Sequence, residues 1–190
     1  MSLVLLSHTQ TESPVDLTGF KNHIGFAVAD TSRDESFALL LEAATDDAQA
    51  FTGLQFMPAL FEQQMGTYHD VIALESFPVT GIDSVKYFDA SNNEIELVSG
   101  TDYYAQINSN PAIIQFNTVF APSTERPDAI RIRFGAGYTA AANVPPLIKA
   151  AILMSAADMY VNPSDAVRGL PTASRNLLRQ YRSHRVIRRD

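Results

Sequence analysis

The side chains that could carry out acid–base chemistry are few and scattered in this sequence of 190 residues. The best candidate for a general base is His69 in the run Tyr68-His69-Asp70, because a neighbouring carboxylate can orient an imidazole. The run has the composition of a turn, and no nucleophile stands beside it. We therefore predict that His69 lies in a surface loop and takes no part in catalysis.

Two pairs of acids have a spacing that could serve general acid–base chemistry, namely Asp46-Asp47 and Glu94/Glu96. Adjacent acids on a helix point apart, and alternating acids on a strand share one face, which is usually in water. We therefore interpret both pairs as solvated side chains. An enzyme would need a pocket that holds His69 or paired carboxylates.

Metal and nucleotide chemistry also lack a complete motif. The sequence has no cysteine, and none of its histidines has a metal-ligand spacing; they are residues 8, 23, 69 and 184. Gly135-Ala136-Gly137 matches the first half of a dinucleotide fingerprint, but the third glycine is absent and Pro145-Pro146 precedes the next helix. We predict that these glycines form a backbone corner that side chains would obstruct, and we expect no cofactor, no metal and no enzymatic activity.

The charge is unevenly distributed along the chain. From Arg168 to Asp190 there are seven arginines and one acid, whereas the whole chain carries a net charge of -7. An acidic body with a basic end suggests that the basic end contacts nucleic acid, an acidic surface of a partner, or a neighbouring copy. A solvated terminus is the alternative without a function. The candidate partner-binding residues are Arg175, Arg179, Arg182, Arg185, Arg188 and Arg189.

The first three of these arginines fall on one side of a predicted helix, and the others roughly continue that side. Such a row can bind phosphates, so a DNA-binding module is one hypothesis. No aromatic residues alternate with the arginines to stack on bases. A contact with an acidic protein surface fits the same residues equally well.

Four helices are predicted from the periodicity. One covers residues 16–24 with Asp16 as its N-cap, and a second begins at the capping box Ser32-Arg33-Asp34-Glu35 and runs to about Thr52, before Gly53. A third begins at Pro146 and ends at Asn162-Pro163, and a fourth begins at Pro171. We expect the third helix to turn one apolar face inward; its members are Leu147, Ala150, Ala151, Met154, Ala157 and Val161.

Between the second and third helices the pattern changes to alternation. Seven short runs rich in aromatic and branched residues are separated by turn residues: ALFEQQM, VIAL, IDSVKYFD, EIELV, DYYAQI, AIIQFN and AIRIRFGAGY. Strands joined so closely must pair antiparallel. The fold class is therefore α+β, a small bundle of about four helices with an inserted antiparallel β meander.

These elements suggest one domain over residues 1–190. Its helical core comes from 14–53 and 144–182, the β-rich insert is 58–138, and 183–190 form a basic C-terminal tail. No apolar run approaches the roughly 20 residues of a membrane span, and the N-terminus lacks the basic region of a signal peptide. We expect no membrane association.

Several segments together resemble one family, the head–tail connector (adaptor or head-completion) proteins of long-tailed phages, prophages and gene transfer agents. The ordered set covers about Pro14 to Arg182, and its members are PVDLTGFKNHIGF, DESFALLLEAATDDAQAFTGLQFM, LESFPVTGIDSVKYFDASNNEIEL, IRIRFGAGYTAAANVPPLIKAAILMSAADMYVNP and LPTASRNLLRQYR. The sequence departs from the family at Gly19, at Gly25 and at Asn162-Pro163, which bears on local helix ends.

The resemblance implies a structural virion protein without catalytic residues. Such proteins self-associate into a ring beneath the portal, typically twelvefold, and extend the DNA channel toward the tail. The implied partners are the portal protein and a tail-side completion protein, with DNA passing through without specific binding. The implied location is the head–tail junction of the virion, after assembly from the bacterial cytoplasm. The family's C-terminal segment, which reaches the portal, corresponds to Arg175 to Arg189.

Overall fold

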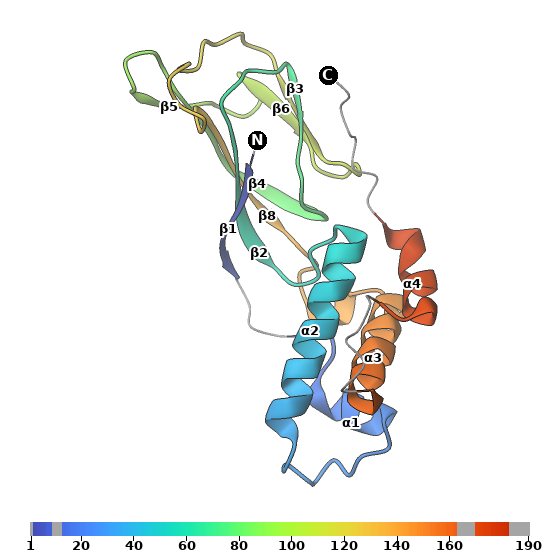
Figure 1. The fold of residues 1–190 in the computed structure, drawn as a ribbon. Coiled ribbons are helices and arrows are strands. Elements are labelled where there is room, and N and C mark those ends of the chain that lie inside the picture. The colour runs from blue at the N-terminus through green and yellow to red at the C-terminus, as the bar shows by residue number, and fades with distance from the viewer. Residues whose placement is uncertain (1, 9–12, 163–169, 183–190) are drawn as a thin grey trace. The chain divides into compact units, whose positions relative to one another are not determined.

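The computed structural model describes residues 2–8, 13–162 and 170–182, and these fold as two compact units (Figure 1). A β unit contains the described residues of Met1–Gln10 and Pro58–Tyr138. A helical unit contains those of Thr11–Met57 and Thr139–Arg182. The chain therefore leaves the helical unit after its second helix and returns to it before the third.

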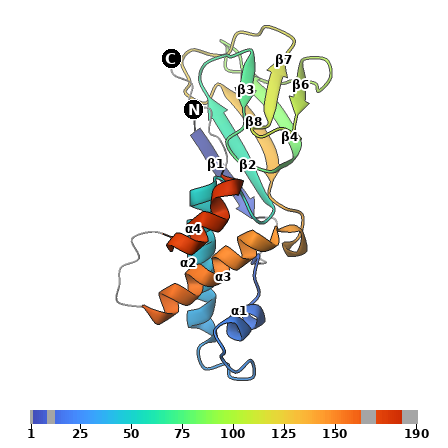
Figure 2. The same cartoon turned by 90° about the vertical axis from the view of Figure 1, so that its right-hand side faces the viewer.

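The helical unit contains the four predicted helices. They are α1 (Leu17–His23), α2 (Asp34–Thr52), α3 (Pro146–Val161) and α4 (Thr172–Leu178), with the short 3-10 turns η1 (Ala141–Asn143) and η2 (Arg179–Tyr181). Both ribbon views show α3 and α4 on the same side of α2 (Figures 1 and 2). Over the described residues, every helix is too short or too polar to cross a lipid bilayer.

The predicted helix ends are confirmed in three places. The side chain of Asp16 accepts a hydrogen bond from the backbone N–H of Gly19 at 2.9 Å, which caps α1. Gly53 ends α2 in the left-handed conformation with φ of 71°. Pro146 is the first residue of α3, where its missing N–H leaves no hydrogen bond unmade.

The prediction of a capping box at the start of α2 was wrong. The helix begins at Asp34, and its N-cap residue Arg33 makes no capping hydrogen bond through its side chain. The backbone N–H of Ser32 instead donates to the carboxylate of Asp30 at 2.9 Å. The backbone N–H of Ser32, which the side chain of Glu35 would accept from in a capping box, is therefore already bonded to Asp30.

A buried lysine fixes the loop that leads into α2. Lys21 is only 3% exposed, and its Nζ donates to the carbonyl oxygens of Val28 and Asp30 at 3.2 and 2.8 Å. The same Nζ lies 2.5 Å from the carboxylate of Asp34, in the first turn of α2. This arrangement, which we call the Lys21 clasp, joins α1 to the start of α2.

The predicted inward face of α3 is confirmed only at Ala151 and was otherwise wrong. The residues that α3 buries are Ile148, Ala151, Ile152, Ser155 and Ala156. Leu147 and Val161, both predicted to be inside, are 40% and 70% exposed. Because only Lys149 and Asp158 are charged among the residues of α3, apolar periodicity did not distinguish its faces.

The β unit contains a strand in each of the seven predicted runs and one more before α1. The strands are β1 (Ser2–His8), β2 (Ala59–Met65), β3 (Val71–Ala73), β4 (Val79–Phe88), β5 (Glu94–Glu96), β6 (Tyr103–Gln106), β7 (Ile113–Phe116) and β8 (Ile130–Ala136). All the paired strands are antiparallel, as predicted.

The single meander, however, was an incorrect prediction. The strands form a five-stranded sheet in the order β1-β2-β8-β4-β5 and a separate three-stranded sheet in the order β3-β7-β6 (Figure 2). The strand β8 pairs with β2 on one side and β4 on the other, and its side chains Ile130, Ile132 and Phe134 are fully buried.

The five-stranded sheet has an apolar face and a charged face. On the apolar face Phe61 of β2 stacks on Phe134 of β8 with ring centroids 5.9 Å apart. On the other face the buried carboxylate of Glu62 lies 2.6 Å from Arg133 Nε and 3.9 Å from Arg131 Nε. Burial acts to raise the pKa of Glu62, but hydrogen bonds from Arg133 and Gln64 bring that pKa below its ordinary value.

Candidate partner-binding surface

Three of the six candidate arginines lie within the described residues, on α4 and η2. Arg175, Arg179 and Arg182 are all exposed, and their spacing of four and three residues places them along one side of this segment. We call these three residues the arginine stripe. The other candidates, Arg185, Arg188 and Arg189, lie outside the described residues.

The arginine stripe is held in place by apolar contacts beneath it. Leu178 of α4 is fully buried, and Leu170 just before α4 is 7% exposed. The guanidinium of Arg175 donates to the carbonyl oxygen of Leu170 at 3.4 Å. The guanidinium carbon of Arg182 lies 5.5 Å from the ring centroid of Phe51 in α2.

None of the three arginines forms an ion pair with a carboxylate of the described residues. By contrast, Arg126, Arg131 and Arg133 of the β unit all do. The charges of the arginine stripe are therefore available to a partner, whereas those of the β unit stabilise its own sheet.

A second charged surface on the helical unit was missed by the sequence reasoning. Glu35, Leu39, Glu42 and Asp46 of α2 are all exposed and follow one side of the helix at spacings of four, three and four residues. We call these four residues the acidic stripe. From the sequence, Asp46 is interpreted as solvated and Glu35 is assigned to a capping box; the helical spacing of the acids, with a leucine 65% exposed among them, is the signal that indicates a shared surface.

The residues considered for acid–base chemistry are not assembled into a site. His69 is exposed in the loop between β2 and β3, as predicted. The carboxylates of Glu94 and Glu96 lie 3.2 and 3.7 Å from the same amine of Lys86, which confirms an exposed strand face. Across residues 2–8, 13–162 and 170–182 there is no group of three or more metal-ligating side chains.

The glycines at the end of β8 are explained by backbone geometry, as predicted. A Cβ atom added at Gly135 would lie 2.6 Å from Thr80 Oγ1 of the neighbouring strand β4. Gly137 has φ of 118°, a conformation that favours glycine, and its N–H donates to the carbonyl oxygen of Pro78 at 2.8 Å. Both glycines are therefore needed for the backbone path at the end of β8.

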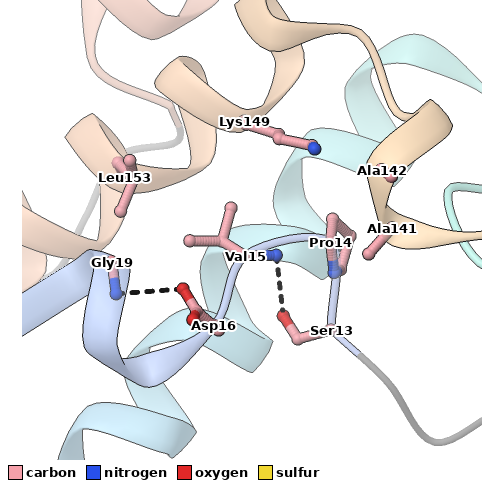
Figure 3. Close-up of a pocket in the computed structure, with 9 residues that line it drawn as sticks. All are labelled: Ser13, Pro14, Val15, Asp16, Gly19, Ala141, Ala142, Lys149 and Leu153. Atoms are coloured by element: carbon pink, nitrogen blue, oxygen red, sulfur yellow. Dashed lines mark hydrogen bonds between the residues drawn. The ribbon is translucent and has the colours of Figure 1, made fainter.

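A pocket of about 570 Å³ lies in the helical unit between the segment before α1, η1 and α3 (Figure 3). Its charged residues are Asp16 and Lys149, and most of the remaining lining is apolar, including Leu153. The carboxylate of Asp16 is already used to cap α1. Its lining residues include neither His69 nor two carboxylates, which were the features that would have supported an enzyme.

Comparison with known proteins gives a full-length match in fold. No protein-family model matches this chain, and no curated protein matches it by sequence. A chain from the neck of an empty gene transfer agent (GTA) particle, computed with C6 symmetry, is similar to it with a TM-score of 0.82 and 18% identity. The match covers 100% of this chain and 99% of that chain.

Two further solved chains are similar over the same extent. One, from the virion of a native GTA particle, has a TM-score of 0.79 and 19% identity, with 100% and 99% of the two chains covered. The other, from the neck of a native GTA particle computed with C12 symmetry, has a TM-score of 0.76, 19% identity and the same coverages of 100% and 99%. The resemblance to the connector family drawn from the sequence is thus confirmed for the fold of the whole chain.

Proposed function

We propose that this chain is a structural protein of the head–tail junction in a long-tailed phage, prophage or gene transfer agent. Copies of it form a ring beneath the portal, which extends the DNA channel toward the tail. Its partners are other copies of itself, the portal protein and a tail-side completion protein. The chain assembles from the bacterial cytoplasm into the virion and catalyses no reaction.

The observation that carries the proposal is the full-length similarity to chains from GTA neck particles. The similarity has a TM-score of 0.82 and extends over 100% of this chain, so it supports one role for the chain as a whole. The similar neck chains occur in particles computed with C6 and C12 symmetry, which is the arrangement expected of a ring on a portal.

The charge distribution supports the same role. The arginine stripe is exposed and unpaired among the described residues, as a surface for an acidic protein partner should be. The chain as a whole is acidic, with a net charge of -7. An acidic channel wall would let DNA slide, because each basic side chain on a phosphate would add affinity.

Deletion of the gene in the producing cell tests the proposal. We expect DNA-filled heads and free tails to accumulate without joining, and expression of the intact chain to restore complete particles. Complete, infectious or transducing particles in the deletion strain would refute the role.

A DNA-binding module remains the alternative for the same arginines. It predicts that the intact chain retards duplex DNA at low salt and that binding weakens steeply as salt rises. The connector role predicts no retardation beyond that of a variant in which Arg175, Arg179 and Arg182 are changed to glutamine. A strong, salt-sensitive shift that the variant loses would favour the alternative.

A further inference from the structure

The acidic stripe occupies the side of α2 that the helical unit leaves uncovered. The residues that α2 buries are Phe37, Leu41, Ala44, Ala48 and Thr52. With about 3.6 residues per turn, Leu39, Glu42 and Asp46 fall on the opposite side of the helix. Leu39 is 65% exposed at the centre of these carboxylates, so the stripe combines charge with an apolar contact point.

The arginine stripe lies on another side of the same unit. Figures 1 and 2 both show α4 beside α3, on the side of α2 where α3 packs. The contact of Arg182 with Phe51 places the end of the arginine stripe near the C-terminal end of α2, away from Glu35 at its start. The two stripes therefore do not meet within one helical unit, and no ion pair joins them in the described residues.

We infer that the arginine stripe of one copy docks on the acidic stripe of the next copy. This inference rests on the proposed ring, because a ring is built from head-to-tail contacts in which each copy presents two different, complementary surfaces. Two complementary surfaces on different sides of one unit meet that requirement. The occupant of the acidic stripe is thus a second copy of this chain.

The two stripes match in spacing as well as in charge. Glu42 and Asp46 are four residues apart on α2, and Arg175 of α4 and Arg179 at the start of η2 are also four residues apart, a spacing of about 6 Å along a helix. Each guanidinium can bind one carboxylate with two hydrogen bonds. The aliphatic stems of the arginines can cover Leu39, since long cationic side chains pack their stems on apolar surface.

A neighbouring copy fits both stripes better than DNA or the portal does. Binding of DNA or of an acidic portal surface would account for the arginine stripe alone and would give no role to the acidic stripe with its exposed Leu39. In a ring, each copy would bind one neighbour through its arginine stripe and the other neighbour through its acidic stripe.

Charge reversal tests the inference with two variants of the full chain. One is Glu42→Arg with Asp46→Arg, and the other is Arg175→Glu with Arg179→Glu. The matched control for the first is Asp83→Arg with Glu125→Arg, which changes the net charge equally at exposed residues of the β unit that form no ion pair there. Circular dichroism and the melting temperature show that each variant folds.

Association is measured by disulfide trapping, because the chain has no cysteine of its own. Ala43→Cys beside the acidic stripe and Asn176→Cys beside the arginine stripe are introduced together; both positions are exposed. Under mild oxidation at low salt we expect a ladder of linked multimers. The ladder should weaken as salt rises, because about 1 M salt screens exposed charges beyond about 3 Å.

Each charge-reversal variant also carries the two cysteines. Its rate of disulfide-linked multimer formation should be lower than that of the parent by a factor of about ten, since two exposed attractive pairs become repulsive. The control should match the parent. An equimolar mixture of the two variants should recover the ladder, because each reversed surface then faces its complement. No ladder for the parent at high concentration, or equal ladders for parent and variants, would overturn the inference.

The outcome for the ring is separate from the outcome for the contact. Variants that still build complete head–tail junctions with normal trapping leave the proposed function intact and refute the contact. Trapping that behaves as expected, together with a chain that never enters particles, supports the contact and refutes the proposed function. If Arg175→Glu with Arg179→Glu abolishes binding to the portal but leaves disulfide trapping between copies unchanged, the contact is refuted and the arginine stripe binds the portal.

Discussion

Replacement of Lys21 by methionine tests whether the Lys21 clasp holds the entry to α2. Met has a similar length and no charge, so Lys21→Met keeps most of the buried packing. It removes the donor to the carbonyl oxygens of Val28 and Asp30 and the partner of Asp34. The acidic stripe begins one residue after Asp34, so its first turn depends on this arrangement.

The expected loss can be worked from these contacts. A hydrogen bond from a charged donor contributes about 1.5–3 kcal/mol, and removal of one partner of a buried ion pair costs about 3–5 kcal/mol. The full sum does not apply, because the side chain of Asp34 is 31% exposed and can be hydrated. We expect the free energy of unfolding of the helical unit to fall by about 2–4 kcal/mol.

Urea denaturation followed by circular dichroism at the helix signal measures this change. Lys149→Met is the matched control, since Lys149 is a half-buried lysine of α3 for which the described residues provide no ion pair. We expect the control to change stability by less than about 0.5 kcal/mol. A loss below about 1 kcal/mol for Lys21→Met, or one equal to that of the control, would show that the clasp does not stabilise the unit.

Three further changes have defined outcomes. Leu178→Ala should lower the free energy of unfolding by about 2–5 kcal/mol, because the side chain is fully buried under α4; a loss below about 1 kcal/mol in urea denaturation would contradict this. Hydrogen bonds from Arg126 and Arg131 hold the pKa of Asp128 below its ordinary value of 3.8, so the stabilisation it provides is present above that pH and is lost as the pH falls. Asp128→Asn should therefore lower the melting temperature at pH 7 and lower it by clearly less near pH 2, where part of the stabilisation has been lost; an equal difference at both pH values would refute the assignment. Gly135→Ala should cost about 1 kcal/mol by its clash with Thr80, and the cost should shrink in a chain that also carries Thr80→Ala; equal costs in the two backgrounds would argue against the clash.

Local signals predicted the elements of this chain well. Asp16, Gly53 and Pro146 mark helix ends through their own backbone or side-chain chemistry, which is short in range and readable from neighbours. The seven alternating runs predicted roughly five to seven strands and their antiparallel pairing for a similar reason. Short connections exclude parallel pairing whatever the rest of the fold does.

Interactions between distant residues were not predictable in the same way. The order of the strands depends on pairing between residues far apart in the sequence, since β8 pairs with β2 and β4, whose residues precede it by more than 40 positions. The buried face of α3 depends on where α2 and α4 pack, since apolar residues surround nearly the whole helix. The Lys21 clasp depends on a loop that brings the carbonyl oxygen of Asp30, nine residues further along the chain, to the amine of Lys21.

The arginines of the candidate partner-binding surface were predicted from the sequence, and the acidic stripe was not. The run of arginines was visible as an excess of one charge, and the structure adds that three of them are exposed without an acid partner among the described residues. The acidic stripe was not assigned because acids on a helix are usually solvated. Its meaning depends on a complementary surface elsewhere on the chain, and only the fold shows on which side of the unit each lies.

Electron cryo-microscopy of this chain mixed with the portal protein encoded in the same genome tests the central claim most directly. The account predicts a closed ring of copies on the tail-facing side of the portal, with rotational symmetry matching the portal and an open central channel. Density in which the chain is absent from the portal, or is bound as isolated copies that form no ring at saturating concentration, would contradict it.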